Sequence, residues 1–527
     1  MGSSSPPPPV EPLRGAVRAL AAASAVLGAV VVARGVSSVL TMRKWRRELI
    51  VVEGKRKGLP APGPPPSLFV GNTPALAGAY YRTLYAHIEE PVSVFYVHST
   101  PFVVVNEVSA VKTVLSGSGG AFIKPRYFGY RSTAVRAAVD ADNALSSAMA
   151  DDGTPVGGGG DTSRRSLLRL IDGAMPDITA ALAELFASWP TRPPPSGADA
   201  VAAAAPAYRD GEDAQAAVLS TIVALNMRLL FGVGPGTPTA NAVASTAARR
   251  ISFAGAEFAR RMVDPKRVWV APLAGARYVA AVVGLVRLGR SLVAAVERLP
   301  ADHWVAAWVG TVRPVAKLGK VIGLLMASSQ TVPLTIVWLL HLLDTHPAVR
   351  ARLAAEADAV LGAGAARRSP TAADLDRLPY TEAVVKETLR LYPPFPLIQR
   401  VATDEAVLGG VAIPAGTPVF VLPYLLHRNA AHFSAPHTYD PDRWLGAGRR
   451  VAGGAPSEWA YAPFGRGPRA CAGAALALAE LKIAAVTAVT AGRFEVEWAG
   501  GRPPGVFPPL GVVPAGARVF RAAGGGV

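Results

Sequence analysis

The chain is almost without cysteine: its 527 residues contain one, Cys471. A single cysteine cannot form an internal disulfide, which excludes the class of small secreted domains that disulfides hold together. The sequence also has no Asn-x-Ser/Thr glycosylation site. We therefore expect the folded domain to face the cytosol or the interior of an organelle.

Motifs for phosphate and nucleic acid are missing as well. The glycine-rich stretch over residues 153–160 lacks the Gly-Lys-Ser/Thr ending that cradles a phosphate, so we predict a flexible loop there. Lys and Arg number 54 against 37 Asp and Glu, which gives a formal net charge of +17. These charges are scattered and carry no nucleic-acid-binding motif. The basic balance therefore indicates a membrane surface or an acidic protein partner and no nucleic acid.

The N-terminal part is low in acidic residues. Residues 1–14 are rich in Ser and Pro and are predicted to be disordered. Residues 15–42 hold an apolar run that predicts a membrane anchor, followed by a basic, proline-rich hinge over 43–66. Because the segment is rich in Ala, Ser and Arg, a plastid or mitochondrial transit peptide is the competing interpretation. The remaining residues, 67–527, are predicted to form one catalytic domain.

The surroundings of Cys471 indicate more than a small buried hydrophobe, which is the simplest interpretation of a lone cysteine. Glycines next to it permit sharp turns and close approach to a flat object: Gly465, Gly467 and Gly473. Arg466 and Arg469 are expected to place positive charge beside the sulfur, which favours the thiolate. A thiolate on a tight loop is one of the axial ligands of haem iron.

The segment from Phe464 to Gly473 resembles the haem-binding signature of the cytochrome P450 family, Phe-x-x-Gly-x-Arg-x-Cys-x-Gly, at every fixed position. Glu387 and Arg390 resemble the family's Glu-x-x-Arg pair, and the segment from Pro441 to Trp444 resembles its later Pro-Glu-Arg-Phe segment. The resemblance is tight over the C-terminal third and weaker back to about residue 58. It implies the cytochrome P450 fold, mainly α with small β-sheets, and haem b with Cys471 as the axial ligand.

Glu387 and Arg390 are three residues apart, so on a helix they share one face and can pair. Arg443 can join them. The resemblance implies a structural triad that holds the cysteine loop. The alternative is a solvated surface pair, which would contribute little to stability.

An apolar helix is predicted from Val321 to Leu343, with a polar run inside it that ends at Thr331. The run resembles the family's Ala-Gly-x-Asp/Glu-Thr-Thr segment, which implies that Thr331 assists proton delivery. Gln330 stands in place of the usual carboxylate, so it can order water but cannot titrate. Pro333 removes a backbone donor. The alternative is that these hydroxyls bond to their own helix.

The resemblance also implies further haem contacts. Arg469, Arg400 and either Arg164 or Arg165 are expected at the propionates, although this chain lacks the Trp that usually precedes the last of these arginines. His427 resembles a position that often does likewise, the alternative being a loop histidine satisfied by other partners. Phe464 is expected to pack beside the thiolate and the haem.

Other elements are predicted from patterning alone. Residues 92–105 predict β-structure, and a helix is expected to begin at Ser166. Apolar helical stretches fill residues 214–298. Trp269 and Tyr278 in this region are expected either in a substrate roof that touches membrane or in an amphipathic core helix.

The function that the resemblance implies is a haem-thiolate monooxygenase of the microsomal type. It would use NADPH electrons from NADPH-cytochrome P450 reductase, or from ferredoxin if plastidial, on a hydrophobic sterol, fatty acid, terpenoid or carotenoid. The expected location is the endoplasmic reticulum membrane with the domain facing the cytosol, the alternative being a chloroplast or mitochondrion. The altered helix leaves an isomerase or dehydratase of a lipid hydroperoxide as the second interpretation. A haem-binding protein without turnover is the third.

Overall fold

The structure is a computed structural model of the 527-residue chain. The residues that it describes are 36–37, 39–52, 60–64, 66, 82–97, 100–117, 120–123, 161–191, 214–234, 238–263, 272–310, 314–445, 458–498 and 517–521. The expected glycine-rich loop at 153–160 and the predicted disordered start at 1–14 lie outside these residues.

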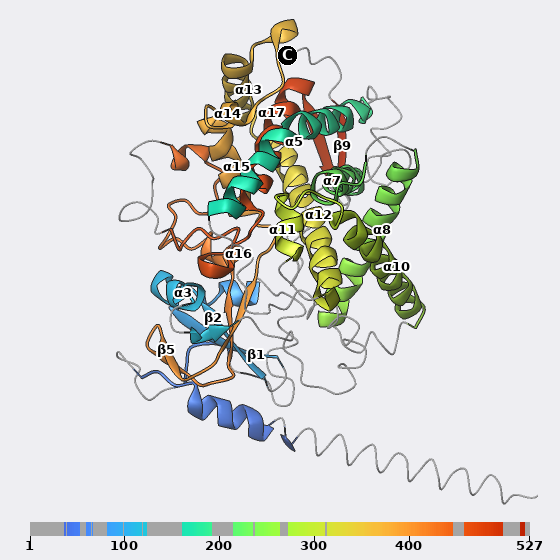
Figure 1. Ribbon diagram of the computed structural model, residues 1–527. Coiled ribbons are helices and arrows are strands. Elements are labelled where there is room, and N and C mark those ends of the chain that lie inside the picture. Colours follow the sequence, from blue (N-terminus) through green and yellow to red (C-terminus); the bar gives the residue numbers. More distant parts are fainter. Residues whose placement is uncertain are drawn as a thin grey trace, which may run out of the picture.

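Helices dominate the described part, as the sequence predicts, and form the upper part of the view in Figure 1. They are α3 (Val108–Leu115), α5 (Asp161–Ser188), α7 (Ala214–Phe231), α8 (Pro238–Val263), α10 (Pro272–Val296), α11 (Trp304–Gly310), α12 (Pro314–Thr345), α13 (Pro347–Leu361), α14 (Ala372–Leu375), α15 (Pro379–Leu391), α16 (Pro423–Leu426) and α17 (Ala474–Ala491). Short 3₁₀ turns include η3 (Pro441–Trp444) and η5 (Gly467–Arg469).

Helix α12 runs through the middle of the helical part and packs against α7, α10, α15 and α17. It is buried from Val332 to Leu340 because that stretch is apolar on every side. The observed helix is longer than the predicted one. Its first turns carry Lys317, which pairs with Glu297 of the segment after α10, so tertiary contacts extend the helix beyond its apolar stretch.

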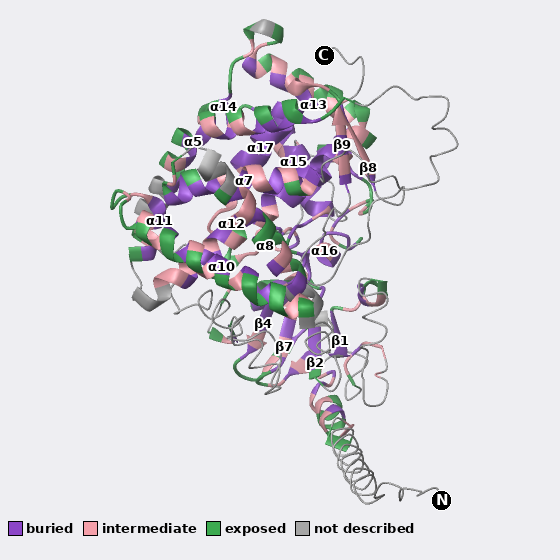
Figure 2. Ribbon diagram, turned by 90° about the vertical axis from the view of Figure 1, so that its right-hand side faces the viewer, coloured by how far each residue is buried: buried purple, intermediate pink, exposed green. Residues whose placement is uncertain are grey.

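The helices predicted within residues 214–298 are present as α7, α8 and α10. Tyr278 is buried in the core of this layer, whereas Trp269 lies outside the described residues. Figure 2 shows α8 and α10 with exposed outer faces and α12 buried behind them. Helix α5 begins at Asp161 and not at Ser166, so Arg164 and Arg165 lie within its first turns.

A five-stranded sheet lies at the lower end of the view in Figure 1 in the order β1-β2-β7-β4-β3. Its strands are β1 (Val92–Val97), β2 (Thr100–Val105), β7 (Pro418–Val421), β4 (Ile398–Ala402) and β3 (Phe122–Ile123). The first two confirm the β-structure predicted over 92–105 and pair as a hairpin, with Val92 opposite Val105. Strand β7 runs parallel to β2 and antiparallel to β4, which brings the C-terminal half of the chain into this sheet.

Two smaller hairpins complete the β-structure. They pair β5 (Ala406–Leu408) with β6 (Val411–Ile413), and β8 (Phe494–Trp498) with β9 (Ala517–Arg521). Val51 forms an isolated bridge to Val411, and Leu49 and Met42 are buried in the core beneath the sheet. The described part of the basic segment is therefore attached to the sheet.

Within the described part, four helices are long and apolar enough to cross a membrane by length and composition. Three of them, α7, α12 and α17, are 61–67% buried inside the protein over the apolar stretch, whereas α10 is 39% buried there. The first three are therefore accounted for by the protein core. The predicted anchor over 15–42 falls mostly outside the described residues and stays a prediction.

Candidate functional site

A fully buried ion pair lies on α15. Arg390 donates from Nε and Nη2 to the two carboxylate oxygens of Glu387, each over 2.8 Å. Both side chains have no exposed surface. A buried pair of charges must have nearly every donor and acceptor satisfied, because desolvation is otherwise costly. The expectation that these residues pair on one helix face is confirmed.

The same carboxylate collects donors from η3. Arg443 Nε donates to Glu387 Oε1 over 3.0 Å, and the indole N–H of Trp444 donates to Oε2 over 3.0 Å. The backbone N–H of Asp440 adds a further bond of 3.0 Å to Oε1. Trp444 is a partner that the sequence reasoning missed, although it stands in the motif that drew attention to Arg443.

The guanidinium groups then hold the chain between α16 and η3. Arg390 donates to the carbonyls of His427, Pro436 and Thr438, over 2.8, 2.6 and 2.9 Å. Arg443 donates to the carbonyl of Ser434 over 3.0 Å. The ion pairs therefore fix the backbone as well as the side chains. We call Glu387, Arg390, Arg443 and Trp444 the Glu387 network.

His427 connects that network to the cysteine loop. Its Nδ1 bonds to the carbonyl of Arg390 over 3.1 Å, and its Nε2 accepts the N–H of Ala462 over 3.0 Å. Burial lowers the pKa of His427 to about 3, so the ring is neutral. Neutral imidazole has one donor and one acceptor, and both are used here. Of the two interpretations of His427, the arrangement supports a loop histidine that is satisfied by other partners. It leaves no ring N–H to donate to a haem propionate.

The cysteine loop is shaped by its backbone. The N–H of Cys471 donates to the carbonyl of Phe464 over 2.8 Å, which closes the loop. Gly465 and Gly467 have φ of 68° and 74°, the left-handed region that favours glycine. A Cβ on Gly467 would lie 2.0 Å from the carbonyl oxygen of Leu115, so glycine is required there for close approach to α3.

The side chain of Arg466 holds the backbone just before this loop. Its Nε and Nη2 donate to the carbonyl of Tyr461 over 3.1 and 2.9 Å. Burial raises the pKa of the Cys471 thiol, and the contribution that lowers it is a hydrogen bond from the N–H of Gly473. Neither Arg466 nor Arg469 is among the groups that change the pKa of this thiol, so the expectation that they favour the thiolate stays a prediction.

The side chain of Cys471 is reached by solvent although protein atoms surround it closely enough to desolvate the thiol. Gly473 caps the start of α17, so the helix N-terminus lies beside the sulfur. Helix N-termini and backbone N–H groups stabilise a thiolate. An accessible cysteine whose sulfur receives a backbone N–H fits an axial metal ligand better than a packing residue.

Of the two arginines expected at the propionates from the later part of the chain, Arg400 is buried and Arg469 is half-buried. Arg400, on β4, is 7% exposed and its guanidinium donates to the carbonyl of Gln399 over 2.9 Å. Burial lowers the pKa of both Arg400 and Arg469. Such groups suit an anionic ligand. The residues present therefore fit a haem with two propionates. The side chains of Arg164 and Arg165 lie outside the described residues.

Helix α12 has a partly exposed face at its polar run, and we call this the open face of α12. Ala327 is exposed and Thr331 half-buried, one turn apart on the same face of the helix and just before its fully buried stretch. The Thr331 hydroxyl donates to the carbonyl of Ala327 over 3.2 Å, and Thr335 donates to the carbonyl of Thr331 over 3.0 Å. The hydroxyl thus bonds to its own helix, the alternative left open by the sequence, and keeps its oxygen lone pairs as acceptors.

Gln330 does not share this open face. Its Nε2 donates to the carbonyl of Ile251, in α8, over 3.1 Å. The side chain therefore points toward the outer layer of helices. Its distance in sequence from Ile251 explains why no local pattern predicted the contact.

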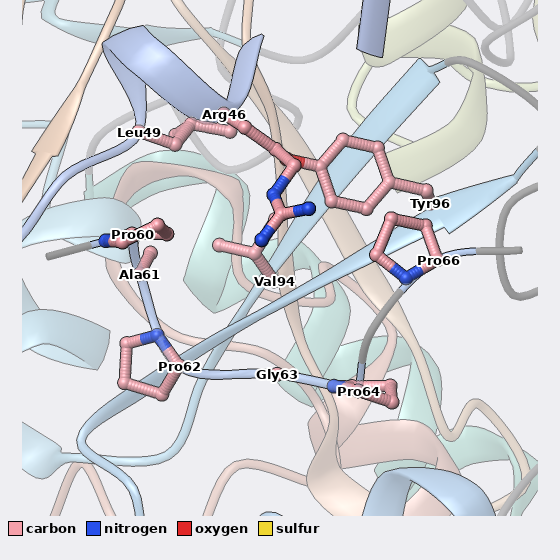
Figure 3. A pocket seen from close by; sticks show the side chains of 10 residues that line it. All are labelled: Arg46, Leu49, Pro60, Ala61, Pro62, Gly63, Pro64, Pro66, Val94 and Tyr96. Atoms are coloured by element: carbon pink, nitrogen blue, oxygen red, sulfur yellow. The ribbon is translucent and has the colours of Figure 1, made fainter. Parts of the chain in front are cut away.

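A hollow of about 280 Å³ lies elsewhere, between the basic N-terminal segment and β1 (Figure 3). It is lined by Arg46, Leu49, Pro60, Ala61, Pro62, Gly63, Pro64, Pro66, Val94 and Tyr96. Burial raises the pKa of Tyr96 to about 12. No residue of the cysteine loop or of α12 lines this hollow, so it is separate from the site built around Cys471.

Comparison with known proteins agrees with this geometry. Residues 317–516 match the family model described as Cytochrome P450. The match contains α12, the Glu387 network and the cysteine loop. Over these residues the chain is similar to the cytochrome P450 family, whose members use haem with a cysteine thiolate as the axial ligand.

Named relatives are similar to about a third of the chain. Cyclooctat-9-en-7-ol 5-monooxygenase of Streptomyces melanosporofaciens is 41% identical over 171 residues, 32% of this chain and 35% of its own. The mitochondrial 25-hydroxyvitamin D-1 alpha hydroxylase of Homo sapiens is 40% identical over 187 residues, 36% of this chain and 35% of its own. The chloroplastic protein LUTEIN DEFICIENT 5 of Arabidopsis thaliana is 36% identical over 185 residues, 34% and 29%. The chain thus spans about a third of the length of these relatives.

Proposed function

We propose that the protein is a haem-thiolate monooxygenase acting on a hydrophobic small molecule. The observation that carries the proposal is the cysteine loop. Cys471 is the one cysteine of the chain, and its loop is joined through Ala462 and His427 to the buried Glu387 network. If haem is bound through a cysteine thiolate, as in the cytochrome P450 family, Cys471 is the one residue of this sequence that can be the ligand.

The proposed haem contacts follow from the described side chains. Cys471 is the axial ligand, with the N–H of Gly473 stabilising its negative charge. Arg400 and Arg469 are proposed at the propionates, where an anion would offset the burial that lowers their pKa. Phe464 packs partly buried at the core beside the loop. When bound, haem supplies the activation of O₂ and the insertion of one oxygen atom into the substrate.

On α12, Thr331 is proposed to hold and pass a proton at Oγ1. The hydroxyl lies on the open face, and rotation about χ1 frees it from the carbonyl of Ala327. Positioned proton transfer typically contributes about 10²–10⁴-fold to rate. Gln330 is tied to Ile251, so it contributes no titrating group and no water-ordering contact on this face.

Electron supply and location are proposed from the family and its relatives. The electrons come from NADPH through a redox partner, a reductase or, in a plastid, ferredoxin. Two relatives are named a monooxygenase and a hydroxylase, which supports oxygen insertion. The basic segment after the proposed anchor supports a membrane-bound enzyme of the endoplasmic reticulum that faces the cytosol. Other relatives carry mitochondrial and chloroplastic names, so these organelles are the alternative.

A second function, rearrangement of a lipid hydroperoxide without external electrons, is favoured by one observation. The position that usually carries a carboxylate is Gln330, and its amide is engaged with α8. An enzyme that needs no proton relay for O₂ would tolerate this change.

Electron dependence separates the two functions. Haem-loaded protein is offered a panel of sterols, fatty acids, terpenoids and carotenoids with NADPH and reductase, or with ferredoxin and its reductase, and separately a lipid hydroperoxide alone. The monooxygenase forms product only with electrons. Product at full rate from the hydroperoxide alone would replace the proposal by the second function.

Thr331→Ala sharpens this test. We expect haem and substrate binding to persist while product per NADPH falls and hydrogen peroxide rises. Thr345→Ala is the matched control, because Thr345 lies at the end of the same helix and also donates to a carbonyl of its own helix, over 2.8 Å. Equal product yields from the two variants would remove Thr331 from proton delivery.

A further inference from the structure

Helices α8 and α12 are joined by one side-chain hydrogen bond at the polar run. Gln330 Nε2 donates to the carbonyl of Ile251 over 3.1 Å. Ile251 lies inside α8, so its carbonyl is also the helical acceptor for the N–H four residues later, that of Gly255. A second donor can reach this carbonyl only where no side chain of α8 covers it.

Gly255 leaves that access open. A Cβ at this position would lie 2.7 Å from Gln330 Nε2 and 3.5 Å from its Cδ and Oε1. The first distance is shorter than real contacts, so an alanine here must displace the amide. Glycine in a helix interior is otherwise unfavourable. Gly255 therefore lowers the helix propensity of α8 but leaves room for the Gln330 amide at the carbonyl of Ile251.

The same stretch of α12 is tied on another side. Asn226, in α7, donates from Nδ2 to the carbonyl of Ser328 over 3.1 Å. The helix's own ladder is interrupted here, because Pro333 has no N–H to offer the carbonyl of Ser329. The segment that precedes Thr331 is therefore held by neighbouring helices where its internal bonding is weakest.

Other close glycine contacts among these helices are of a different kind. A Cβ on Gly289, in α10, would lie 2.5 Å from the side chain of Ile322, which is apolar packing against α12. A Cβ on Gly284 would lie 2.6 Å from the guanidinium of Arg250, which is contact between α8 and α10. Of these three glycines, Gly255 alone meets a side-chain donor that is bonded to a carbonyl one helical turn before it.

We infer that Gly255 is a positioning residue. It admits the Gln330 amide to the carbonyl of Ile251, and this α8–α12 latch sets the position of α12 next to Thr331. Movement of α8 is thereby coupled to the open face of α12. The inference goes beyond the proposed activity, because it concerns local opening of two helices and holds for a monooxygenase and for a hydroperoxide isomerase alike.

Hydrogen exchange of the full-length, haem-loaded protein tests the latch. In Gly255→Ala, the amides of peptides covering 247–257 and 325–332 should exchange faster, by about tenfold, because the latch no longer opposes local opening. The global unfolding temperature should change little, since alanine favours the helix and offsets the lost hydrogen bond. A merely structural role would lower the unfolding temperature together with protection.

Gly173→Ala is the matched control. Gly173 lies inside α5, and a Cβ there would meet nothing within 4 Å, so the change alters helix propensity alone. Exchange in the two latch peptides should stay as in the wild type.

Gln330→Glu and Gln330→Ala approach the latch from the other helix. Neither has an N–H to donate once the glutamate is ionised, so both should accelerate exchange as Gly255→Ala does. The double variant Gly255→Ala, Gln330→Ala should exchange no faster than either single one, because the three changes remove one bond. Wild-type exchange in Gly255→Ala, wild-type exchange in Gln330→Glu, or multiplied effects in the double variant would each overturn the inference. If Gly255→Ala fails to fold, the Gln330 variants decide alone.

Discussion

The Glu387 network and the middle of α12 are built on opposite principles. In the network, a buried carboxylate receives donors from Arg390, Arg443, Trp444 and one backbone N–H, and its guanidinium groups hold backbone carbonyls. In the middle of α12, Asn226 and Gln330 supply neutral contacts to neighbouring helices, while the buried hydroxyl of Ser329 and the amide oxygen of Asn226 have no hydrogen-bond partner among the described residues. The segment that carries Cys471 is therefore held by charged contacts, whereas the middle of α12 is held by neutral ones and is adjustable.

This difference matches the two tasks that the proposal assigns. A metal ligand must be held in one position, and charge-assisted bonds to backbone do this well. A helix whose hydroxyl passes protons must be able to change its shape at low cost. Loosely bonded segments are those that open locally.

Glu387→Ala should have the largest effect, because it breaks the rigid side. Removing one member of a buried ion network leaves the other charges unpaired, at a cost of ~3–5 kcal/mol. We expect the variant to lose haem, which absorption measures, and to unfold at a lower denaturant concentration, which chemical denaturation measures.

Asp442→Ala is the control for this change. Asp442 is the neighbour of Arg443 in η3 and pairs with Arg352, but the two side chains are 60% and 51% exposed. Exposed pairs contribute about 0–1 kcal/mol, so this variant should keep its haem. If Glu387→Ala were as stable and as haem-replete as Asp442→Ala, the network would not hold the loop.

Glu480 sharpens the comparison as a buried carboxyl without such partners. It lies in α17, is 2% exposed, and one of its oxygens has no hydrogen-bond partner among the described residues. Burial raises the pKa of Glu480 to about 8. The unfolded chain releases this proton near pH 4.5 and the folded one near pH 8. Stability is therefore lost as pH rises through this window.

Glu480→Gln should remove that loss. The free energy of unfolding should rise by about 3 kcal/mol at pH 7 relative to the wild type, with little gain near pH 4. Denaturation curves across this range measure the difference. A gain that does not depend on pH would show that Glu480 is not protonated by burial.

Ser329→Ala should have the smallest effect and tests the adjustable side. Its hydroxyl is fully buried and unpartnered among the described residues, so replacing it removes an unsatisfied group. The free energy of unfolding should stay unchanged or rise by up to about 1 kcal/mol. A clear loss would mean that the middle of α12 is as tightly specified as the network.

The sequence predicted the rigid side well because its information is local. The fixed spacing from Phe464 to Gly473 and the three-residue step from Glu387 to Arg390 each span a short stretch of sequence. Helix α12 and the hairpin over 92–105 follow from apolar patterning for the same reason. Apolar patterning did not predict where α12 begins, because the ion pair between Lys317 and Glu297 near its start forms only in the folded chain.

What the sequence could not predict depends on distant partners. Gln330 finds Ile251 79 residues earlier, and His427 is satisfied by the backbone of Arg390 and Ala462. Arg466 lies five residues before Cys471 in sequence, but its partner is the backbone carbonyl of Tyr461. Glu480 left a visible signal, a lone carboxylate in a helix that is apolar all round, which the sequence reasoning passed over.

The most direct test of the account is the absorption spectrum of the reduced protein with carbon monoxide. If Cys471 is the thiolate ligand, haem-loaded wild-type protein shows the red-shifted band of thiolate-ligated haem, and Cys471→His loses that band while it still folds. An unshifted band from folded, haem-loaded wild type, or a red-shifted band that survives Cys471→His, would contradict the assignment on which the account rests.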